Sequence, residues 1–326
     1  MKQINWGIIG CGDVTERKSG PAFNKIAGSK LVAVMRRNAE KAKDYAYRHH
    51  VPTWYNDAKK LIADAEVNAI YVATPPVNHA EFCVAALNAG KPVYVEKPMS
   101  TNVESAKKMM EAAEQTGIKL SVAHYRRQLP YFKKIKSLID EDAIGRVLLV
   151  NLQVLQPSKS EIIGQTEDQW RLNPSISGGG YFYDLAPHQL DLLIYFFGSD
   201  YTASGISENL SRAYYADDAT SGSILFNKEV LFTGTWCFSC APEHAKDYCE
   251  IIGTMGRITF SFFDWKPIIL DAGNRQETFN LDSLEHVQLP MIEKVVEYFR
   301  DEGPNPCSAK DGVEVMKLME IFTKKS

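Results

Sequence analysis

The sequence has no apolar run long enough to span a bilayer, no internal repeat and no low-complexity segment. It also has little net charge, −3 over 326 residues, so it lacks the basic field that would attract nucleic acid or an acidic membrane surface. Its first ten residues, MKQINWGIIG, are typical of the start of a strand rather than of a signal peptide. We therefore expect a globular protein without nucleic-acid or membrane partners.

Cysteine is scarce as well, with six residues spread over the chain. Only Cys237 and Cys240 form a C-x-x-C pair, and no second pair stands at a zinc-site spacing from it. The pair alone is a weak signal for zinc or redox chemistry, so two incidental thiols are the favoured interpretation. This cysteine usage predicts no metal site and fits a reduced, cytoplasmic protein.

What the first third of the chain does contain is an alternation of short apolar runs and helical patterns. Strands are predicted in INWGIIG, KLVAVMR, AIYVATP, PVYVEKP and KLSVAHY, and amphipathic stretches such as NVESAKKMMEAAEQTG separate them. Strands that alternate with helices form βαβ units and a parallel sheet that is covered on both faces. We predict a doubly wound α/β Rossmann domain over residues 1–123.

The pattern changes after residue 123. A helical stretch, YFKKIKSLIDEDAIG, leads into RVLLVNLQVLQ, and turn residues separate later runs such as VLFTGTWCF and GRITFSFF. This pattern predicts an α+β domain over residues 124–326, with a large, mostly antiparallel sheet that is open on one face and covered by helices on the other. A last helix over about residues 311–322 is expected to pack back on the body.

A glycine-rich turn follows the first predicted strand. In IIGCGDVT, Gly10 allows a tight turn and Gly12 lets a pyrophosphate approach the backbone. Asp13 and Val14 belong to the same turn. The third fingerprint position is Thr rather than Gly or Ala, and Gly20-Pro21 stands where the first helix would continue. We expect a dinucleotide site with a lengthened glycine loop; a tight turn without a ligand is the alternative.

The end of the second strand, VAVMRRN, bears on the choice of cofactor. NAD-binding proteins usually offer Asp or Glu there to accept a hydrogen bond from the ribose 2′-hydroxyl, whereas this chain offers Arg36 and Arg37. A guanidinium binds a 2′-phosphate bidentately, and a carboxylate repels it. We predict NADP(H) as the preferred cofactor and NAD(H) as the second choice. The alternative is that two arginines cap a solvated strand end.

Two further strand ends lie at the carboxyl edge of the sheet, where doubly wound folds bind ligands. ATPPVNH places Thr74, Pro75 and His79 there, although His79 could equally be a polar residue at a helix start. VYVEKPMS places Glu96 and Lys97 there, and the proline that follows biases Lys97 away from helical geometry. Lys97 is a candidate to hydrogen-bond a substrate hydroxyl and to stabilise the negative charge that develops on it.

The second domain offers an acid and an imidazole. In SGGGYFYDLAPHQLDLLIYFFG, Asp184 and His188 are four residues apart, so they share a face if the segment is helical, and three glycines precede them. Histidine is the usual general base near neutral pH, and the proton of a reacting hydroxyl needs an acceptor. The alternative is a carboxylate that favours the helix dipole and a histidine in a polar interface.

These motifs together resemble one known family. The chain combines G-x-G after the first strand with E-K-P at Glu96–Pro98, R-R-x-x-P at Arg126–Pro130, W-R at Trp170–Arg171 and G-G-G-x-x-x-D-x-x-x-H-x-x-D at Gly178–Asp191. Over nearly its whole length it is similar to the glucose–fructose oxidoreductase / inositol dehydrogenase (Gfo/Idh/MocA) family.

The resemblance implies a Rossmann domain and a C-terminal α/β domain whose open sheet commonly forms a homodimer or homotetramer. It implies nicotinamide-dependent oxidation or reduction at a carbon of a sugar or polyol. By position, Lys97 would be the catalytic lysine, His188 the acid/base and Asp184 its substrate-binding neighbour. The residues that the resemblance places near the cofactor or substrate are Arg127, Trp170 and Arg171.

The expected reaction is direct hydride transfer between a carbinol carbon and nicotinamide C4, with His188 exchanging the hydroxyl proton while Lys97 and Asp184 orient the oxygen. The family also includes dihydrodiol dehydrogenases, bilin reductases and non-catalytic sensors, so its fold does not choose the substrate. A dihydrodiol dehydrogenase and an NADP(H)-responsive binding protein without activity remain the alternatives. The candidate cofactor contacts are Gly10, Gly12, Asp13, Val14, Arg36, Arg37, Thr74, Pro75, His79, Glu96, Lys97, Arg127, Trp170 and Arg171.

Overall fold

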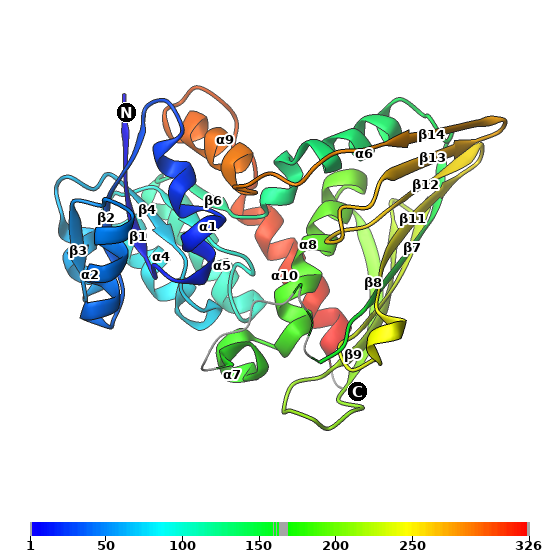
Figure 1. Cartoon of the computed structure of the whole chain (residues 1–326), viewed down its shortest axis with the longest axis horizontal. Coiled ribbons are helices and arrows are strands. Elements are labelled where there is room, and N and C mark those ends of the chain that lie inside the picture. Colours follow the sequence, from blue (N-terminus) through cyan, green and yellow to red (C-terminus); the bar gives the residue numbers. More distant parts are fainter. Residues whose placement is uncertain (1, 159, 161, 163–168, 325–326) are drawn as a thin grey trace. The chain divides into compact units, whose positions relative to one another are not determined.

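The computed structural model of the chain describes residues 2–158, 160, 162 and 169–324, which form two compact units (Figure 1). Unit 1 comprises Met1–Arg126 and Leu284–Met316, and unit 2 comprises Arg127–Ser283 and Lys317–Ser326. The Rossmann domain expected over residues 1–123 therefore lies within unit 1. Residues 284–316, which we expected in the second domain, belong to unit 1 as well. None of the helices in the described part of the chain is long and apolar enough to cross a membrane.

Unit 1 is built on a six-stranded parallel sheet in the order β3-β2-β1-β4-β5-β6. Its strands are β1 (Ile4–Ile9), β2 (Ser29–Met35), β3 (Thr53–Tyr55), β4 (Ala69–Val72), β5 (Val93–Val95) and β6 (Leu120–Val122). Every residue of β4 and β5 is buried, as expected for central strands with helices on both faces. This is the Rossmann strand order, and it places the switch point between β1 and β4.

Three helices of unit 1 begin where the sequence supplies a side-chain cap. Asn38, Asp57 and Asn102 each accept a backbone N–H of the first turn, which fixes the starts of three helices. The helical elements between the strands are α1 (Asp13–Arg17), η1 (Gly20–Asn24), α2 (Ala39–Arg48), α3 (Ala58–Ala63), η2 (Pro76–Asn78), α4 (His79–Asn88) and α5 (Val103–Thr116). Gly117 ends α5 in the left-handed region, which favours glycine.

The returning segment completes unit 1 because its side chains are part of the same core. Its helix α9 (Leu289–Phe299) brings Phe299 to within 5.5 Å of the Trp6 ring in β1. Further along, the carbonyl of Cys307 accepts the Ser121 hydroxyl of β6 at 3.1 Å. The last helix, α10 (Ala309–Thr323), covers the predicted range 311–322 and belongs to unit 1 up to Met316.

Unit 2 is built on an eight-stranded sheet in the order β14-β13-β12-β11-β7-β10-β9-β8, in which only β10 and β7 pair in parallel. The strands are β7 (Val147–Leu155), β8 (Tyr201–Glu208), β9 (Ala219–Phe226), β10 (Val230–Cys237), β11 (Lys246–Gly253), β12 (Gly256–Phe260), β13 (Ile268–Ala272) and β14 (Arg275–Phe279). The expectation of a large, mostly antiparallel sheet is confirmed.

Helices cover one face of this sheet. The helical elements of unit 2 are α6 (Pro130–Asp140), η4 (Trp170–Leu172), α7 (Pro174–Ser177), α8 (Gly180–Phe197) and η5 (Pro242–His244), with η3 (Tyr125–Gln128) at the unit boundary. The ring centroids of Phe132 in α6 and Phe260 lie 6.4 Å apart, and those of Phe182 in α8 and Trp236 lie 5.2 Å apart. α6 and α8 therefore supply the apolar layer that packs on the sheet (Figure 1).

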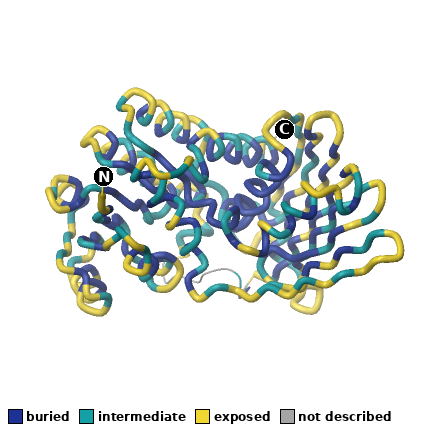
Figure 2. The backbone as a smooth tube through the Cα atoms, turned by 90° about the horizontal axis from the view of Figure 1, so that it is seen from above, coloured by how far each residue is buried: buried dark blue, intermediate teal, exposed yellow. Residues whose placement is uncertain are grey.

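The other face of the sheet carries partly exposed apolar side chains. Along β10, buried and exposed residues alternate, and its outward Leu231 pairs in register with Leu149 of β7 and Leu225 of β9. These leucines are each between 36% and 41% exposed. In Figure 2, the strands of the unit 2 sheet accordingly carry both buried and exposed residues along their length. The open face that the sequence predicts therefore carries a row of leucines across three strands.

Candidate active site

The glycine turn after β1 is shaped for a ligand. Gly10 has φ +96°, and a Cβ there would lie 2.8 Å from the backbone of Ala73 and Thr74, so only glycine fits. Gly12 is different: its backbone is extended, and a Cβ there would meet nothing nearer than the Gly10 carbonyl at 3.9 Å. Nothing in the described chain requires a glycine at position 12, whereas a close-approaching dinucleotide phosphate would. The turn therefore fits the cofactor that the fold implies.

The segment after the turn differs from our expectation. The prediction of a lengthened glycine loop is wrong, because α1 begins at Asp13, directly after Gly12. Thr15, in the third fingerprint position, is buried and donates its hydroxyl to the Gly12 carbonyl at 2.7 Å. The helix is short, and Gly20-Pro21 starts the separate turn η1. Asp13 is exposed and Val14 half-buried in the first turn of α1.

The two arginines after β2 occupy different environments. Arg36 is half-buried, and its Nη1 donates to the Cys11 carbonyl of the glycine turn at 3.4 Å, whereas Arg37 is exposed. The Cys11 side chain is fully buried, and this burial raises the pKa of its thiol to about 12, which favours the protonated thiol near neutral pH. Arg36 therefore lies beside the glycine turn, whereas Arg37 points to solvent.

The loop after β4 is tied to the loop after β5 by His79. Its ring is fully buried, with Nε2 2.7 Å from the Thr74 carbonyl and Nδ1 3.0 Å from the Pro98 carbonyl. Burial lowers the pKa of His79. The Thr74 hydroxyl oxygen is buried and has no hydrogen-bond partner among the described residues, so it is available to a ligand. Pro75 follows it, half-buried, as the residue before η2.

Glu96 and Lys97 follow β5 directly. Glu96 is buried, and its carboxylate accepts the Lys97 backbone N–H at Oε2, 3.1 Å away. Its other oxygen accepts the Tyr71 hydroxyl and the Gln288 side-chain amide. Lys97 is half-buried, and the peptide bond between Lys97 and Pro98 is cis. The strand end thus carries a lysine whose backbone is held by a buried carboxylate.

In unit 2, α8 carries the predicted acid and imidazole. Asp184 and His188 are one helical turn apart on one face of this helix, as the sequence predicts. Asp184 is half-buried and accepts the Nε–H of Arg171 at 3.0 Å, while the Arg171 guanidinium lies 4.5 Å from the Trp170 ring centroid. The structure therefore brings Trp170, Arg171 and Asp184 together. The His188 ring is buried, and its centroid lies 5.9 Å from that of the Phe263 ring.

A second carboxylate of α8 holds a different arginine. Asp191 is 1% exposed and forms a buried ion pair with Arg127, with Nη2 2.7 Å and Nε 3.0 Å from its carboxylate oxygens. The Arg127 guanidinium also lies over the Tyr195 ring at 5.5 Å. Asp191 was a motif position without an assigned role, and the structure shows that it fixes Arg127.

The sequence interpretation missed the residues that surround Glu96. Tyr71 and Tyr94 stand in strands as apparent core aromatics, and Gln288 lies in a polar stretch without a motif. A buried carboxylate needs donors, and that requirement is the one signal that could have prompted a search for them.

In the described part of the chain, no group of three or more His, Cys, Asp or Glu is arranged to hold a metal ion.

Comparison with known proteins identifies the family. Residues 4–124 match the "Oxidoreductase family, NAD-binding Rossmann fold" of GFO/IDH/MocA proteins, and residues 132–259 match the "GFO/IDH/MocA C-terminal domain". The chain is 45% identical to Oxidoreductase P35 of Formosa agariphila, over 98% of each chain. It is 24% identical to D-xylose 1-dehydrogenase [NADP(+)] of Haloarcula marismortui, over 91% of this chain and 82% of that protein.

A solved structure agrees with the fold. Levoglucosan dehydrogenase in complex with NADH superposes with a TM-score of 0.86 at 22% identity, and the match covers 98% of this chain and 96% of that one. The chain therefore shares the fold of that structure over nearly its whole length. The chain belongs to the Gfo/Idh/MocA family, and it is an enzyme of the NAD(P)-binding oxidoreductase class.

Proposed function

We propose that the chain is a dehydrogenase or reductase that transfers a hydride between a nicotinamide cofactor and a hydroxyl-bearing carbon of a sugar or polyol. The observation that carries the proposal is Lys97, half-buried at the carboxyl end of β5 and held through its backbone by the buried Glu96. In a doubly wound sheet, that edge is where ligands bind. Two similar proteins are named for dehydrogenation of D-xylose and of levoglucosan, which supports a carbohydrate substrate.

In this proposal three side chains act on the substrate. Lys97 donates a hydrogen bond to the reacting oxygen and stabilises the charge that develops on it. His188 takes the hydroxyl proton during oxidation and returns it during reduction. Asp184 orients the hydroxyl, and its own position is fixed by Arg171 at 3.0 Å. When bound, the nicotinamide accepts or supplies the hydride.

The remaining candidate residues are proposed to hold the cofactor or line its site. Two residues support this assignment most directly. A Cβ at Gly12 would meet open space, and the buried Thr74 hydroxyl has no hydrogen-bond partner among the described residues. The proposed cofactor contacts are Gly10, Gly12, Asp13, Val14, Arg36, Arg37, Thr74, Pro75, His79, Glu96, Lys97, Arg127, Trp170 and Arg171.

A two-step experiment tests the function. Titration with NADPH, followed by cofactor fluorescence, measures binding, and a panel of D-xylose, levoglucosan, myo-inositol and a cyclic trans-dihydrodiol then measures turnover with NADP⁺. Oxidation of a sugar or polyol supports the proposal, whereas oxidation of the dihydrodiol alone assigns the chain to the other substrate class. Binding of NADPH without turnover of any panel member contradicts the proposal and indicates a sensor.

The preferred cofactor is proposed to be NADP(H), and Arg36→Asp tests it. Removing a charge-assisted hydrogen bond to the 2′-phosphate costs about 1.5–3 kcal/mol, so the KM for NADP⁺ is expected to rise about 10- to 100-fold. The KM for NAD⁺, which lacks this phosphate, is expected to change less than about threefold. Steady-state kinetics with both cofactors measure the ratio.

Lys43→Asp is the matched control, because it makes the same change of charge at an exposed position of α2. It is expected to leave the ratio of the two KM values unchanged. A wild-type preference for NAD⁺, or an unchanged ratio in Arg36→Asp, would refute the NADP(H) assignment.

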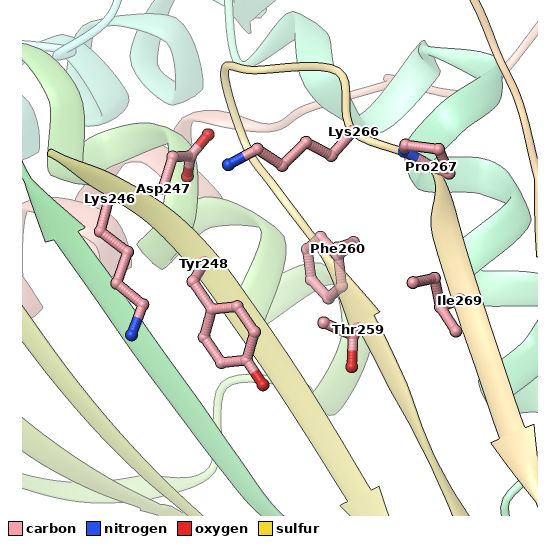
Figure 3. Close-up of a pocket in the computed structure, with 8 residues that line it drawn as sticks. All are labelled: Lys246, Asp247, Tyr248, Thr259, Phe260, Lys266, Pro267 and Ile269. Atoms are coloured by element: carbon pink, nitrogen blue, oxygen red, sulfur yellow. The ribbon is translucent and has the colours of Figure 1, made fainter.

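We also propose that the chain forms a homodimer or homotetramer through the open face of the unit 2 sheet. The row of Leu149, Leu231 and Leu225 crosses three adjacent strands there. The same sheet has a hollow of about 300 Å³ whose lining includes Tyr248 and Ile269 (Figure 3). An exposed apolar sheet face is an association surface, and a two-fold axis would set the row against its own copy.

Leu231→Lys is expected to convert the oligomer to a single chain of 36.6 kDa, because an ammonium would be buried in the apolar row. Light scattering coupled to size exclusion measures the mass. Tyr47→Lys is the control, since Tyr47 is 82% exposed on α2 of unit 1, and it is expected to leave the mass unchanged. A wild-type mass of one chain would contradict the proposed assembly.

We propose a cytoplasmic location on the basis of the cysteines. All six are free thiols, and four of them are buried. Free thiols persist in reducing compartments, whereas secreted and extracellular proteins commonly form disulfides. Fluorescent tagging of the protein in its cell of origin, compared with compartment markers, would test the location.

A further inference from the structure

A buried chain of hydrogen bonds surrounds Glu96 in unit 1. The Tyr94 hydroxyl lies 3.3 Å from Gln288 Oε1, and Gln288 Nε2 donates to Glu96 Oε1 at 2.6 Å. The Tyr71 hydroxyl donates to the same carboxylate oxygen, and the Lys97 backbone N–H donates to Oε2 at 3.1 Å. Both tyrosines and Gln288 are fully buried, and Glu96 is 5% exposed. One carboxylate thus receives three donors.

The direction of each hydrogen bond follows from the chemistry of the groups. Burial raises the pKa of Tyr71 and of Tyr94 well above its ordinary value, so both phenols are neutral and carry a proton to donate. Tyr94 donates to the carbonyl oxygen of the Gln288 side chain, which leaves the amide –NH₂ to donate to Glu96. With three donors, Glu96 is satisfied as a buried carboxylate.

Gln288 reaches Glu96 from a distant part of the sequence. It lies immediately before α9, in the segment that returns to unit 1, 192 positions after Glu96. Its backbone N–H donates to the Lys18 carbonyl at 3.2 Å, and the neighbouring His286 has Nδ1 2.8 Å from the Arg17 carbonyl. The same short stretch therefore contacts both the end of the α1 turn and the carboxylate beside Lys97.

This polar cluster is costly for a core. Replacing a buried hydrogen-bonded pair with two apolar side chains of the same shape often leaves the folding stability unchanged or raises it. The need for stability alone therefore does not explain why this polar cluster is present. What the cluster does provide is a fixed orientation for Glu96, and Glu96 holds the backbone of Lys97. A lysine that stabilises a developing charge must be held to a fraction of an ångström.

We propose that Gln288 and Tyr71 are positioning residues for Lys97 that act through Glu96. The inference rests on the proposed function, since it assigns them a role in turnover rather than in cofactor binding. Each donates to Glu96 Oε1, and the loss of either donor lets the carboxylate turn away from the Lys97 amide. The strand end then loses one of its anchors, while the glycine turn keeps its own contacts.

Gln288→Leu and Tyr71→Phe are each expected to lower kcat about tenfold with the best substrate of the panel. The Kd of NADPH is expected to change less than threefold, because only Glu96 and Lys97 among the proposed cofactor contacts are disturbed, while the glycine turn, Arg36 and Thr74 keep their positions. Hydrogen exchange gives a readout that needs no substrate. The Lys97 amide is expected to exchange at least tenfold faster in both variants, whereas the Glu96 amide, bonded to the Val72 carbonyl at 2.9 Å, stays unchanged.

A double-mutant cycle separates positioning from general destabilisation. In a Lys97→Ala background, Gln288→Leu is expected to have no further effect on the residual rate. Tyr131→Phe is the matched control, because Tyr131 is a buried tyrosine of unit 2 whose hydroxyl donates to the Lys266 carbonyl at 2.7 Å. It is expected to lower the Tm and leave kcat unchanged.

Three results would overturn the inference: an unchanged kcat in both single variants, an unchanged exchange rate at the Lys97 amide, or an equal loss of rate in the Lys97→Ala background. Its failure differs from that of the proposed function. If the wild type turns over no member of the panel, the proposed function fails; if the wild type is active, Lys97→Ala is inactive and the other two variants keep their turnover, only the positioning role fails. Should Gln288→Leu not fold, Tyr71→Phe carries the test alone.

Discussion

Lys97→Ala is expected to lower kcat by about 10²- to 10³-fold, the usual loss when a donor to a developing oxyanion is removed. The Kd of NADPH is expected to change less than about threefold, because the glycine turn and Arg36 are untouched. The Glu96–Lys97 contact uses the backbone N–H, so it survives the substitution. Steady-state kinetics give kcat, and a fluorescence titration gives Kd, so a transition-state role is separated from a binding role.

Lys108→Ala is the control for this prediction. Lys108 is an exposed lysine of α5 that pairs with Glu104, so the same change of charge is made in the same unit without effect on turnover. A kcat of Lys97→Ala within threefold of the wild type would contradict the catalytic role. A large rise in the Kd of NADPH at unchanged kcat would instead assign Lys97 to the cofactor.

The architecture was predictable because its signals are local. Alternating apolar runs and amphipathic stretches predict βαβ units, and an asparagine or aspartate stands as the N-cap immediately before α2, α3 and α5. Alternation along a run such as β10 predicts a sheet with one open face. Each of these patterns depends on residues within one turn or one strand of each other, so no tertiary knowledge is needed.

The glycine loop shows how a local signal misleads. Gly20-Pro21 indicates an interruption of the first helix, and we took this as a sign that the phosphate loop extends up to it. The structure puts a complete short helix before it, because Thr15 closes the turn onto the Gly12 carbonyl and Tyr45 donates to the Thr15 carbonyl at 2.8 Å. The second of these contacts comes from α2, thirty residues away, and no pattern near the loop predicts it.

The site could be predicted only where a residue type stands at a strand end or on a helix face. Lys97, Asp184 and His188 are such residues, and motif spacing is sufficient to single them out. Gln288 is not, because its contact with Glu96 depends on the return of residues 284–316 to unit 1. The pairing of Asp191 with Arg127, 64 positions away, is equally invisible in a single sequence. Polar contacts between residues that are far apart in the sequence produce no periodic pattern from which they could be predicted.

Asp191→Ala is expected to destabilise the protein by about 3–5 kcal/mol, because it leaves the buried Arg127 guanidinium without its carboxylate. Arg127 is 6% exposed and Asp191 1%, so water does not replace the lost partner. Urea unfolding measures the loss. Glu104→Ala, which breaks the exposed pair with Lys108, is the control and is expected to leave the urea midpoint almost unchanged. A loss below about 1 kcal/mol in Asp191→Ala would contradict the prediction.

The double variant Arg127→Met, Asp191→Leu shows whether the pair is structural or also binds the cofactor. Removing both charges replaces a buried ion pair with apolar side chains, so most of the stability is expected to return. If Arg127 contacts the cofactor as proposed, this stable variant binds NADPH at least tenfold more weakly, since a charge-assisted contact is lost. If its Kd equals that of the wild type, Arg127 only anchors α8 through Asp191, and the cofactor site is smaller than proposed.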